Sequence, residues 1–203
     1  MKKLCKRILI CAVFAACVWS WGVIKDRERL NEELLRLHVV ANSDSDEDQA
    51  VKLRVRDEVT ACLQADLADI EDAREALAYL REKLPELEET ANRVLEECGV
   101  KDRARVSLQK EAFDTRVYDT FTLPAGVYES LRITIGEGEG KNWWCVVFPT
   151  LCVPATAEGF EETAEEAGLE DALACALTGE AGYEVRFFFL DVLGKLENMF
   201  HRG

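Results

Sequence analysis

The hydrophobic and polar positions between residues 34 and 63 change from one pattern to another. Residues 34–41 (LLRLHVVA) form a dense aliphatic and β-branched run, which is typical of a strand. A polar cluster, NSDSDEDQ, follows at residues 42–49. After it, apolar side chains recur every four residues on one helical face: Val51, Val55, Val59 and Leu63. The pattern therefore predicts a strand, a turn and an amphipathic helix.

A longer helical pattern covers residues 70–98. Its apolar positions alternate three and four apart: Ala73, Leu77, Leu80, Leu84, Leu87, Ala91, Val94 and Cys98. That spacing lines one stripe of a helix, and we expect the stripe to pack on the protein's own sheet rather than in a dimeric coiled coil. Pro85 interrupts the pattern, so the segment is either two shorter helices or one kinked helix, and Gly99 ends it.

From residue 103 onward the apolar positions repeat every two residues, as they do in strands. Val106 and Leu108 alternate with polar residues, and residues 121–126 (FTLPAG) turn the chain. The next strand has three apolar residues on one face: Leu131, Ile133 and Ile135. We therefore expect two antiparallel strands joined through this turn.

A glycine-rich stretch connects this strand to another. Residues 136–141 (GEGEGK) supply the backbone freedom of a tight connection, and residues 144–148 form a return strand that Pro149 stops. The sequence thus predicts a hairpin from Gly136 to Cys152. The glycines do not form a phosphate-binding loop, because the stretch lies between strands and lacks the Gly-Lys-Ser or Gly-Lys-Thr ending.

The remaining residues complete the expected fold. Residues 155–168 are predicted to be an exposed connection, 169–177 a short helix, 185–190 (VRFFFL) a buried strand and 192–200 an amphipathic helix that packs in the core or meets a membrane or partner helix. The fold class is therefore α+β. We expect one extracytoplasmic domain with an N-terminal strand, two to three helices, an antiparallel hairpin-rich sheet, and a C-terminal strand and helix.

The N-terminus has the pattern of an export segment. Residues 1–7 carry four basic side chains and no acid, residues 8–24 carry no charge, and charges return at residues 25–29. The chain thus divides into an export segment, 1–29, and a domain, 30–203. Trp19 and Trp21 lie where aromatic side chains meet a membrane surface.

Three fates of this segment are open. It is retained as a signal anchor, cleaved as a signal peptide, or processed at a lipoprotein box, residues 14–17, with Cys17 acylated. We favour the anchor, because no Ala-x-Ala cleavage motif follows the apolar run.

Charge excludes one class of partner. The chain has a formal net charge of −14, and its first 24 residues contribute +4, which leaves −18 for the remainder. A body that acidic is repelled by phosphate backbones, so we expect no nucleic-acid partner.

The cysteines do not indicate a metal site. Of eight cysteines, three lie in the export segment; no Cys-x-x-Cys pair occurs, and the chain has two histidines. Cys62 and Cys98 are expected on the apolar faces of helices, as small hydrophobic side chains. Cys145 and Cys152 either remain core thiols, which we favour, or close a short disulfide loop. No metal or other cofactor is expected.

No residue pattern predicts a catalytic centre. Asp44, Asp46 and Asp48 resemble a calcium loop, but in that register Gln49 occupies the glycine position and Val55 the glutamate position. We instead expect Ser43 or Ser45 to cap the following helix. His38 lies within a predicted strand and is expected to be structural, and no nucleophile motif accompanies any serine or cysteine.

Two adjacent tryptophans follow the glycine stretch. Successive strand residues point to opposite faces, so one of Trp143 and Trp144 is expected in the core and the other outward. An outward tryptophan with a polar rim is typical of a protein-binding hot spot. The alternative is that both rings cover the end of the hairpin.

Two long stretches closely resemble a known family. Residues 35–57 (LRLHVVANSDSDEDQAVKLRVRD) and 121–153 (FTLPAGVYESLRITIGEGEGKNWWCVVFPTLCV) are similar to stage II sporulation protein R of endospore-forming Firmicutes, and the resemblance extends from about residue 34 to 200. It implies a protein made in the forespore and exported into the intermembrane space. There, such a protein triggers a membrane-embedded aspartic protease of the mother cell, which cleaves pro-sigma-E. The implied role is signalling and protease activation, without catalysis by this chain.

We place the protease contact on the predicted hairpin. Trp143 and Trp144, with Lys141 and Asn142, are expected to present the recognised surface, and the segment from Asn42 through Asp44 to Asp48 is expected to adjoin it. Two other classes compete with this hypothesis: an extracytoplasmic hydrolase using Asp44, Asp46 and His38, and a structural envelope lipoprotein.

Overall fold

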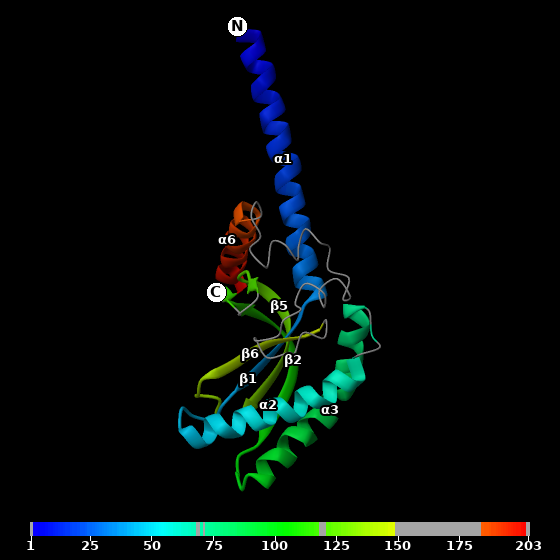
Figure 1. Cartoon of the computed structure of the whole chain (residues 1–203), viewed down its shortest axis with the longest axis vertical. Coiled ribbons are helices and arrows are strands. Elements are labelled where there is room, and N and C mark those ends of the chain that lie inside the picture. The colour runs from blue at the N-terminus through cyan, green and yellow to red at the C-terminus, as the bar shows by residue number, and fades with distance from the viewer. Residues whose placement is uncertain (1, 68–69, 71, 118–120, 149–183, 202–203) are drawn as a thin grey trace.

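The computed structural model describes residues 2–67, 70, 72–117, 121–148 and 184–201 (Figure 1). It confirms the α+β class. Along the chain the elements are α1 (Lys2–Glu33), β1 (Leu35–Val40), α2 (Asp46–Leu67), α3 (Ala73–Glu97), β2 (Ala104–Phe113), β3 (Arg116–Val117), β4 (Thr122–Leu123), β5 (Gly126–Ile135), β6 (Asn142–Phe148) and α6 (Glu184–His201).

Four of the strands form one mixed sheet in the order β2-β5-β1-β6. β1 pairs in parallel with β5 and antiparallel with β6, while β2 pairs antiparallel with β5. The predicted hairpin from Gly136 to Cys152 is therefore wrong, because β1 lies between the two strands that the glycine loop connects. All six residues of β1 are buried, as is typical of a central strand covered on both faces.

Helices α2 and α3 cover one face of the sheet. The predicted stripe of α2 is confirmed, with Val55 and Val59 fully buried against it. The segment after it is a single helix, α3, that contains Pro85. Its buried residues are Ala76, Leu80, Leu87, Ala91, Val94 and Leu95. Gly99, at φ 73°, lets the chain leave this helix, and the Val100 N–H then donates to the Leu95 carbonyl at 2.9 Å.

The other face of the sheet is covered by the end of α1 and by α6. A second apolar cluster there contains Val23 and Leu30 of α1, Tyr128 of β5 and Leu190 of α6. Gly194 allows close approach, because a Cβ atom on it would lie 1.6 Å from the Ala125 carbonyl oxygen. The sheet thus lies between two helix pairs, α2 with α3 and α1 with α6, and a separate apolar cluster fills the space on each face.

The expectation of a strand at residues 185–190 is wrong, since α6 begins at Glu184. Aromatic runs favour strands, but here the side chains that face the body recur at helical spacing: Phe187, Leu190, Gly194 and Asn198. Asn198 donates from its amide to the Phe113 carbonyl at 2.6 Å. Docking on the body through this face therefore overrides the local strand preference.

The cysteine expectations are met in part. Cys145 is buried in the main core and Cys98 packs at its edge, but Cys62 is exposed, because the buried stripe of α2 runs through Val59 and Leu63 instead. Cys152 lies outside the described residues, and so do the predicted connection and helix at 155–168 and 169–177.

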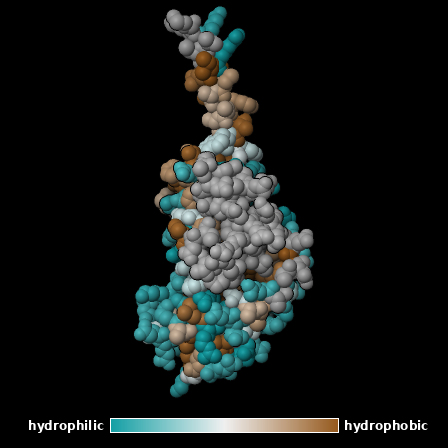
Figure 2. All heavy atoms as spheres, in the orientation of Figure 1, coloured by the Kyte–Doolittle hydropathy of each residue, from teal (hydrophilic) through white to brown (hydrophobic). Residues whose placement is uncertain are grey.

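The N-terminal helix leaves the body as a long projection (Figure 1). Residues 6–21 are exposed, whereas Val23, Arg27 and Leu30 are buried against the body. Within the described residues, Lys6–Glu33 is the one helix long and apolar enough to cross a membrane, a test that a signal sequence also passes. Figure 2 shows apolar side chains along the projecting part. The expected division between residues 29 and 30 falls inside this helix.

Candidate partner-binding surface

The turn between β1 and α2 supplies one part of the candidate surface. Ser45 caps α2, since its hydroxyl oxygen accepts a hydrogen bond from the Asp48 N–H at 3.2 Å. The Asp48 carboxylate accepts from the Ser43 hydroxyl at 2.5 Å and from the Asn42 amide at 3.1 Å. The Ser43 hydroxyl is the largest cause that lowers the pKa of Asp48 from its ordinary 3.8. The expected cap is therefore confirmed at Ser45.

The glycine loop lies directly on this turn, with Asn42 as its main support. The Glu137 N–H donates to the side-chain oxygen of Asn42 at 3.0 Å, and the Glu139 N–H donates to its backbone oxygen at 3.1 Å. Gly136 has φ 57°, and a Cβ atom there would lie 2.2 Å from the side-chain oxygen of Asn42. Glycine takes this path without strain, whereas another residue would be strained at this φ and would displace the Asn42 side chain.

The end of the loop is held by the same turn. The Gly140 N–H donates to the Ala41 carbonyl at 2.9 Å, and the Lys141 N–H donates to the Asp44 carboxylate at 2.6 Å. From α2, the buried Lys52 ammonium donates to the Lys141 carbonyl at 3.0 Å. Burial lowers the pKa of Lys52. These contacts fix the backbone of the loop while the side chains of Lys141 and Asn142 remain exposed.

Trp143 and Trp144 follow the loop at the start of β6, on opposite faces of the sheet. Trp143 is half-buried against the main core, on the side of α2 and α3, and the guanidinium of Arg56 lies 4.1 Å from the centroid of its ring. Its indole nitrogen is buried and has no hydrogen-bond partner among the described residues.

Trp144 is half-buried on the other face. Its ring stacks on His38 of β1 at 3.7 Å between centroids with 16° between the planes, and it meets Phe113 edge-on at 5.1 Å. The guanidinium of Arg116 lies 5.0 Å from its centroid. Neither tryptophan therefore faces outward as expected. The prediction that the two tryptophans lie on opposite faces of the sheet is confirmed, but both faces are covered by other elements.

His38 lies within a strand, as expected, and is buried in an ionic cluster beneath Trp144. Its Nδ1 atom lies 3.2 Å from the Glu111 carboxylate, which also accepts from Arg132 at 2.5 Å. Burial raises the pKa of Glu111, but the hydrogen bonds with His38 and Arg132 outweigh that effect, and the pKa falls to about 2. No described contact joins His38 to Asp44 or Asp46, the residues grouped with it in the hydrolase hypothesis.

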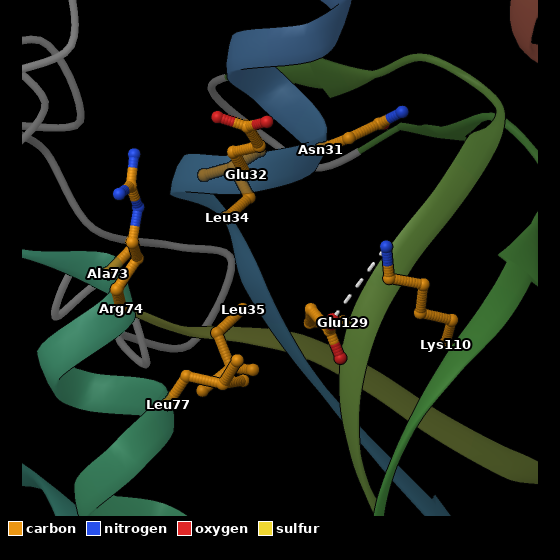
Figure 3. Close-up of a pocket in the computed structure, with 9 residues that line it drawn as sticks. All are labelled: Asn31, Glu32, Leu34, Leu35, Ala73, Arg74, Leu77, Lys110 and Glu129. Carbon is orange, nitrogen blue, oxygen red and sulfur yellow. Dashed lines mark ion pairs between the residues drawn. The ribbon is translucent and has the colours of Figure 1, made fainter.

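Two of the hollows away from the glycine loop are lined by residues of the sheet. One, of about 280 Å³, is lined by His38, Lys110, Glu111, Arg132, Trp144 and His201 among others. The other, of about 220 Å³, lies where α1 meets β1 and the start of α3 (Figure 3). Lys110 and Glu129 form an ion pair of 3.9 Å across its wall, and Leu35 and Leu77 line its floor. Within the described residues, no group of three or more acidic, histidine or cysteine side chains is arranged to hold a metal ion.

The structure thus brings four of the six expected contact residues to one exposed edge. Asn42, Asp44, Lys141 and Asn142 meet through the loop and the turn, while Trp143 and Trp144 lie half-buried behind them. The same two segments also carry four exposed acids: Asp46, Glu47, Glu137 and Glu139. We refer to residues 42–48 and 136–142 as the loop edge.

Sequence reasoning missed the residues that hold the loop edge in place. Lys52 and Arg56 face the loop and Trp143 from α2, one turn apart, and their position on the α2 face next to Val55 was a usable signal. Glu111 gave no such signal, because its partners His38 and Arg132 are distant in the sequence.

Fold and surface together define a class of protein. It is an α+β domain whose sheet is enclosed by two helix pairs, and whose N-terminal helix runs on into a projecting segment apolar enough to cross a membrane. Its described residues present a polar loop edge and no metal-ligand cluster.

The family follows from comparison with known proteins. The model of the family described as stage II sporulation protein R matches residues 31–158. Stage II sporulation protein R of Bacillus subtilis (strain 168) is 36% identical over 183 residues, which cover 81% of this chain and 82% of that protein. The chain therefore belongs to the stage II sporulation protein R family, which confirms the resemblance. No solved structure is detectably similar to it.

Proposed function

We propose that this protein is exported from the forespore and activates a membrane-embedded aspartic protease of the mother cell, which then cleaves pro-sigma-E. Family membership over most of the chain is the observation that carries this proposal. The chain acts by binding and performs no reaction itself. The family description, which names a stage of sporulation and no reaction, agrees with that role.

The N-terminal helix supports the exported location. Its charge-free residues 8–24 project from the body, and the four basic residues before them stay on the side of synthesis. The body would then lie in the space between the two membranes, tethered close to the forespore membrane if the helix is retained.

The loop edge supports a direct contact with the protease. Its backbone is fixed by hydrogen bonds to the turn, so binding would cost little conformational entropy. Lys141 and Asn142 expose their side chains while only their backbones hold the loop. To activate the protease, this edge must bind its active state more tightly than its inactive state, since only differential affinity shifts such an equilibrium.

The decisive experiment is reconstitution in a bacterial host that does not sporulate. The protease and pro-sigma-E are expressed with or without this protein, exported through its own N-terminal segment, and cleavage is followed by immunoblot. Cleavage only when this chain is present supports a direct activator. Unchanged cleavage, with export and protease expression verified, would refute the proposed activity.

The contact surface is tested in the same system with Lys141→Ala combined with Asn142→Ala. This pair should reduce cleavage about tenfold or more, as truncation of central contact residues does. The matched control is Gln64→Ala with Arg81→Ala, an exposed amide and an exposed cation on α2 and α3. Substituting both tryptophans is a poorer test, because each ring packs against a core and its loss would also impair folding.

Equal cleavage by the loop-edge pair and its control would place the contact elsewhere on the body. Circular dichroism of both purified variants separates loss of contact from loss of fold.

A further inference from the structure

The outward face of α6 is apolar along its whole length. At 100° per residue, its exposed large side chains fall within one stripe: Val185, Phe188, Phe189, Leu196, Met199 and Phe200. They are opposite the face that docks on the body through Leu190 and Gly194. A surface helix normally carries polar residues on its outer side, so an exposed apolar stripe of this kind marks a contact site along at least part of its length.

The start of α6 lies beside the end of the apolar projection of α1. The Phe189 ring meets Trp19 edge-on at 5.0 Å between centroids, and Phe188 packs against Phe189 at 5.7 Å. Arg186 forms an ion pair of 2.5 Å with Asp26. The first turns of α6 are therefore level with the last residues of the charge-free run of α1.

The rest of α6 leads away from that level. Figure 1 shows the start of α6 nearer the projecting end of α1 and its C-terminal end beside the sheet. At 1.5 Å per residue, Phe200 is about 16 Å further along the helix than Phe189. Only the first turns of α6 can reach whatever surrounds the apolar part of α1.

We propose that Val185, Phe188 and Phe189 insert into the headgroup region of the bilayer that α1 crosses, as a second membrane contact beside the anchor. The occupant of this part of the stripe is lipid, because the patch is continuous with a helix of membrane-spanning length through the Trp19 contact. The inference rests on the proposed export and requires that α1 stays in the membrane as an anchor.

The surrounding residues fit a membrane interface. Trp19 and Trp21 are aromatic side chains of the kind that gather at the headgroup level, and Lys25 lies 5.8 Å from the Trp21 ring, where a cation can reach lipid phosphates. The ion pair of Arg186 with Asp26 neutralises charge next to the patch. The acidic remainder of the body is repelled by anionic lipid, so contact ends after the first turns of α6.

Photolabelling of the full chain tests this directly. The protein is reconstituted in vesicles of phosphatidylcholine and phosphatidylglycerol that contain a lipid with a photoreactive diazirine near its headgroup. After irradiation, trypsin releases three informative peptides, residues 8–25, 187–195 and 196–202. We expect label on 8–25 and 187–195, and about tenfold less on 196–202, which holds the distal part of the same stripe.

The outcomes separate this inference from the anchor. Label on 8–25 alone leaves α1 in the membrane but overturns the α6 contact. If none of the three peptides is labelled, neither α1 nor α6 contacts the membrane, and both the anchor and the α6 contact are refuted. Equal label on 187–195 and 196–202 would mean that α6 lies flat on the bilayer, which also contradicts the placement proposed.

A paired substitution strengthens the test. Phe188→Ser with Phe189→Ser should lower labelling of residues 187–195 about tenfold while that of 8–25 stays unchanged. Met199→Ser with Phe200→Ser is the matched control on the distal stripe and should leave both signals as in the unchanged protein. All four side chains are exposed, so neither pair removes a core contact.

Discussion

Asn42 and Gly140 show how single residues shape the loop edge. The side chain of Asn42 accepts from the loop and donates to Asp48, so it links the start of α2 to the glycine loop. Gly140 passes so close to this turn that a Cβ atom would lie 2.2 Å from the Ser43 carbonyl oxygen. The loop edge therefore depends on one amide and on the absence of a Cβ atom at both Gly136 and Gly140.

Replacing Gly140 by alanine should destabilise the protein by about 1–3 kcal/mol, the usual cost of overpacking, because the backbone of Ser43 cannot move aside cheaply. Urea denaturation measures it. Gly22→Ala is the control, since a Cβ atom there has nothing within 4 Å and alanine favours a helix. Similar stability of the two variants would mean that the loop does not approach the turn this closely.

Glu111 predicts an acid-dependent difference in stability. Its pKa of about 2 in the folded protein lies below its ordinary 4.5, so the stabilisation is fully present above about pH 4.5 and is lost as the pH falls toward 2. Glu111→Gln should lower the unfolding free energy at pH 7 by about 1–2 kcal/mol. The gap between the two proteins should then close with acidification. A gap that stays constant from pH 7 to pH 3 would exclude this carboxylate as the cause.

At the scale of elements, the helices were predictable and the strand order was not. Local spacing located α2, its cap and the stripe of α3, because those patterns depend on neighbours within a few residues. The pairing of β1 with β5 and β6 depends on residues far along the chain. One signal was present: residues 34–41 are a dense aliphatic run with Leu34 and Val40 on the face opposite Leu37, which favours a central strand over an edge, although Arg36 and His38 share that second face.

The loop edge was predicted for a reason that proved partly wrong. The glycine stretch and the turn at Asn42 were expected to adjoin, and they do, although the glycine loop crosses the end of β1 instead of closing a hairpin. The burial of Trp143 and Trp144 could not be predicted, because Arg56, His38 and Phe113 reach them from other elements.

Hydrogen exchange distinguishes the observed sheet from the expected hairpin. Amides of β1 (residues 35–40) are bonded on both sides of the strand and should be among the slowest to exchange, whereas β6 lies at an edge of its sheet. The measurement is exchange mass spectrometry on the full chain in detergent. Fast exchange in β1 together with strong protection across all of β6 would contradict the strand order β2-β5-β1-β6.

At the scale of the molecule, Arg27 joins the N-terminal helix to α6. Its buried guanidinium donates to the carbonyls of Ala125 and Leu190, both at 3.2 Å, and pairs with Glu197. The same side chain therefore fixes the angle at which α1 leaves the body and the position of α6 beside it.

Arg27→Ala should cost about 2–4 kcal/mol, since it removes two buried hydrogen bonds, to the carbonyls of Ala125 and Leu190, and the ion pair with Glu197. It should also release α6, so trypsin should cut after Arg186 and Lys195 faster than in the unchanged protein. Lys25→Ala is the control, because Lys25 is exposed and pairs with Glu28 on its own helix. Equal cleavage rates for the two variants would show that α6 is held without Arg27.

The central position of β1 also governs when the chain can fold. β1 is the first strand to be synthesised, yet both of its partners, β5 and β6, lie beyond residue 125. Pairings between segments so distant in the chain form slowly, because the chain loses the entropy of closing a long loop before the stabilising contacts can form. When the body crosses the membrane behind its N-terminal segment, as the proposed export requires, the sheet cannot assemble until residues 126–148 have also emerged. Until then the polypeptide stays unfolded, which is the condition that passage through a translocation channel requires.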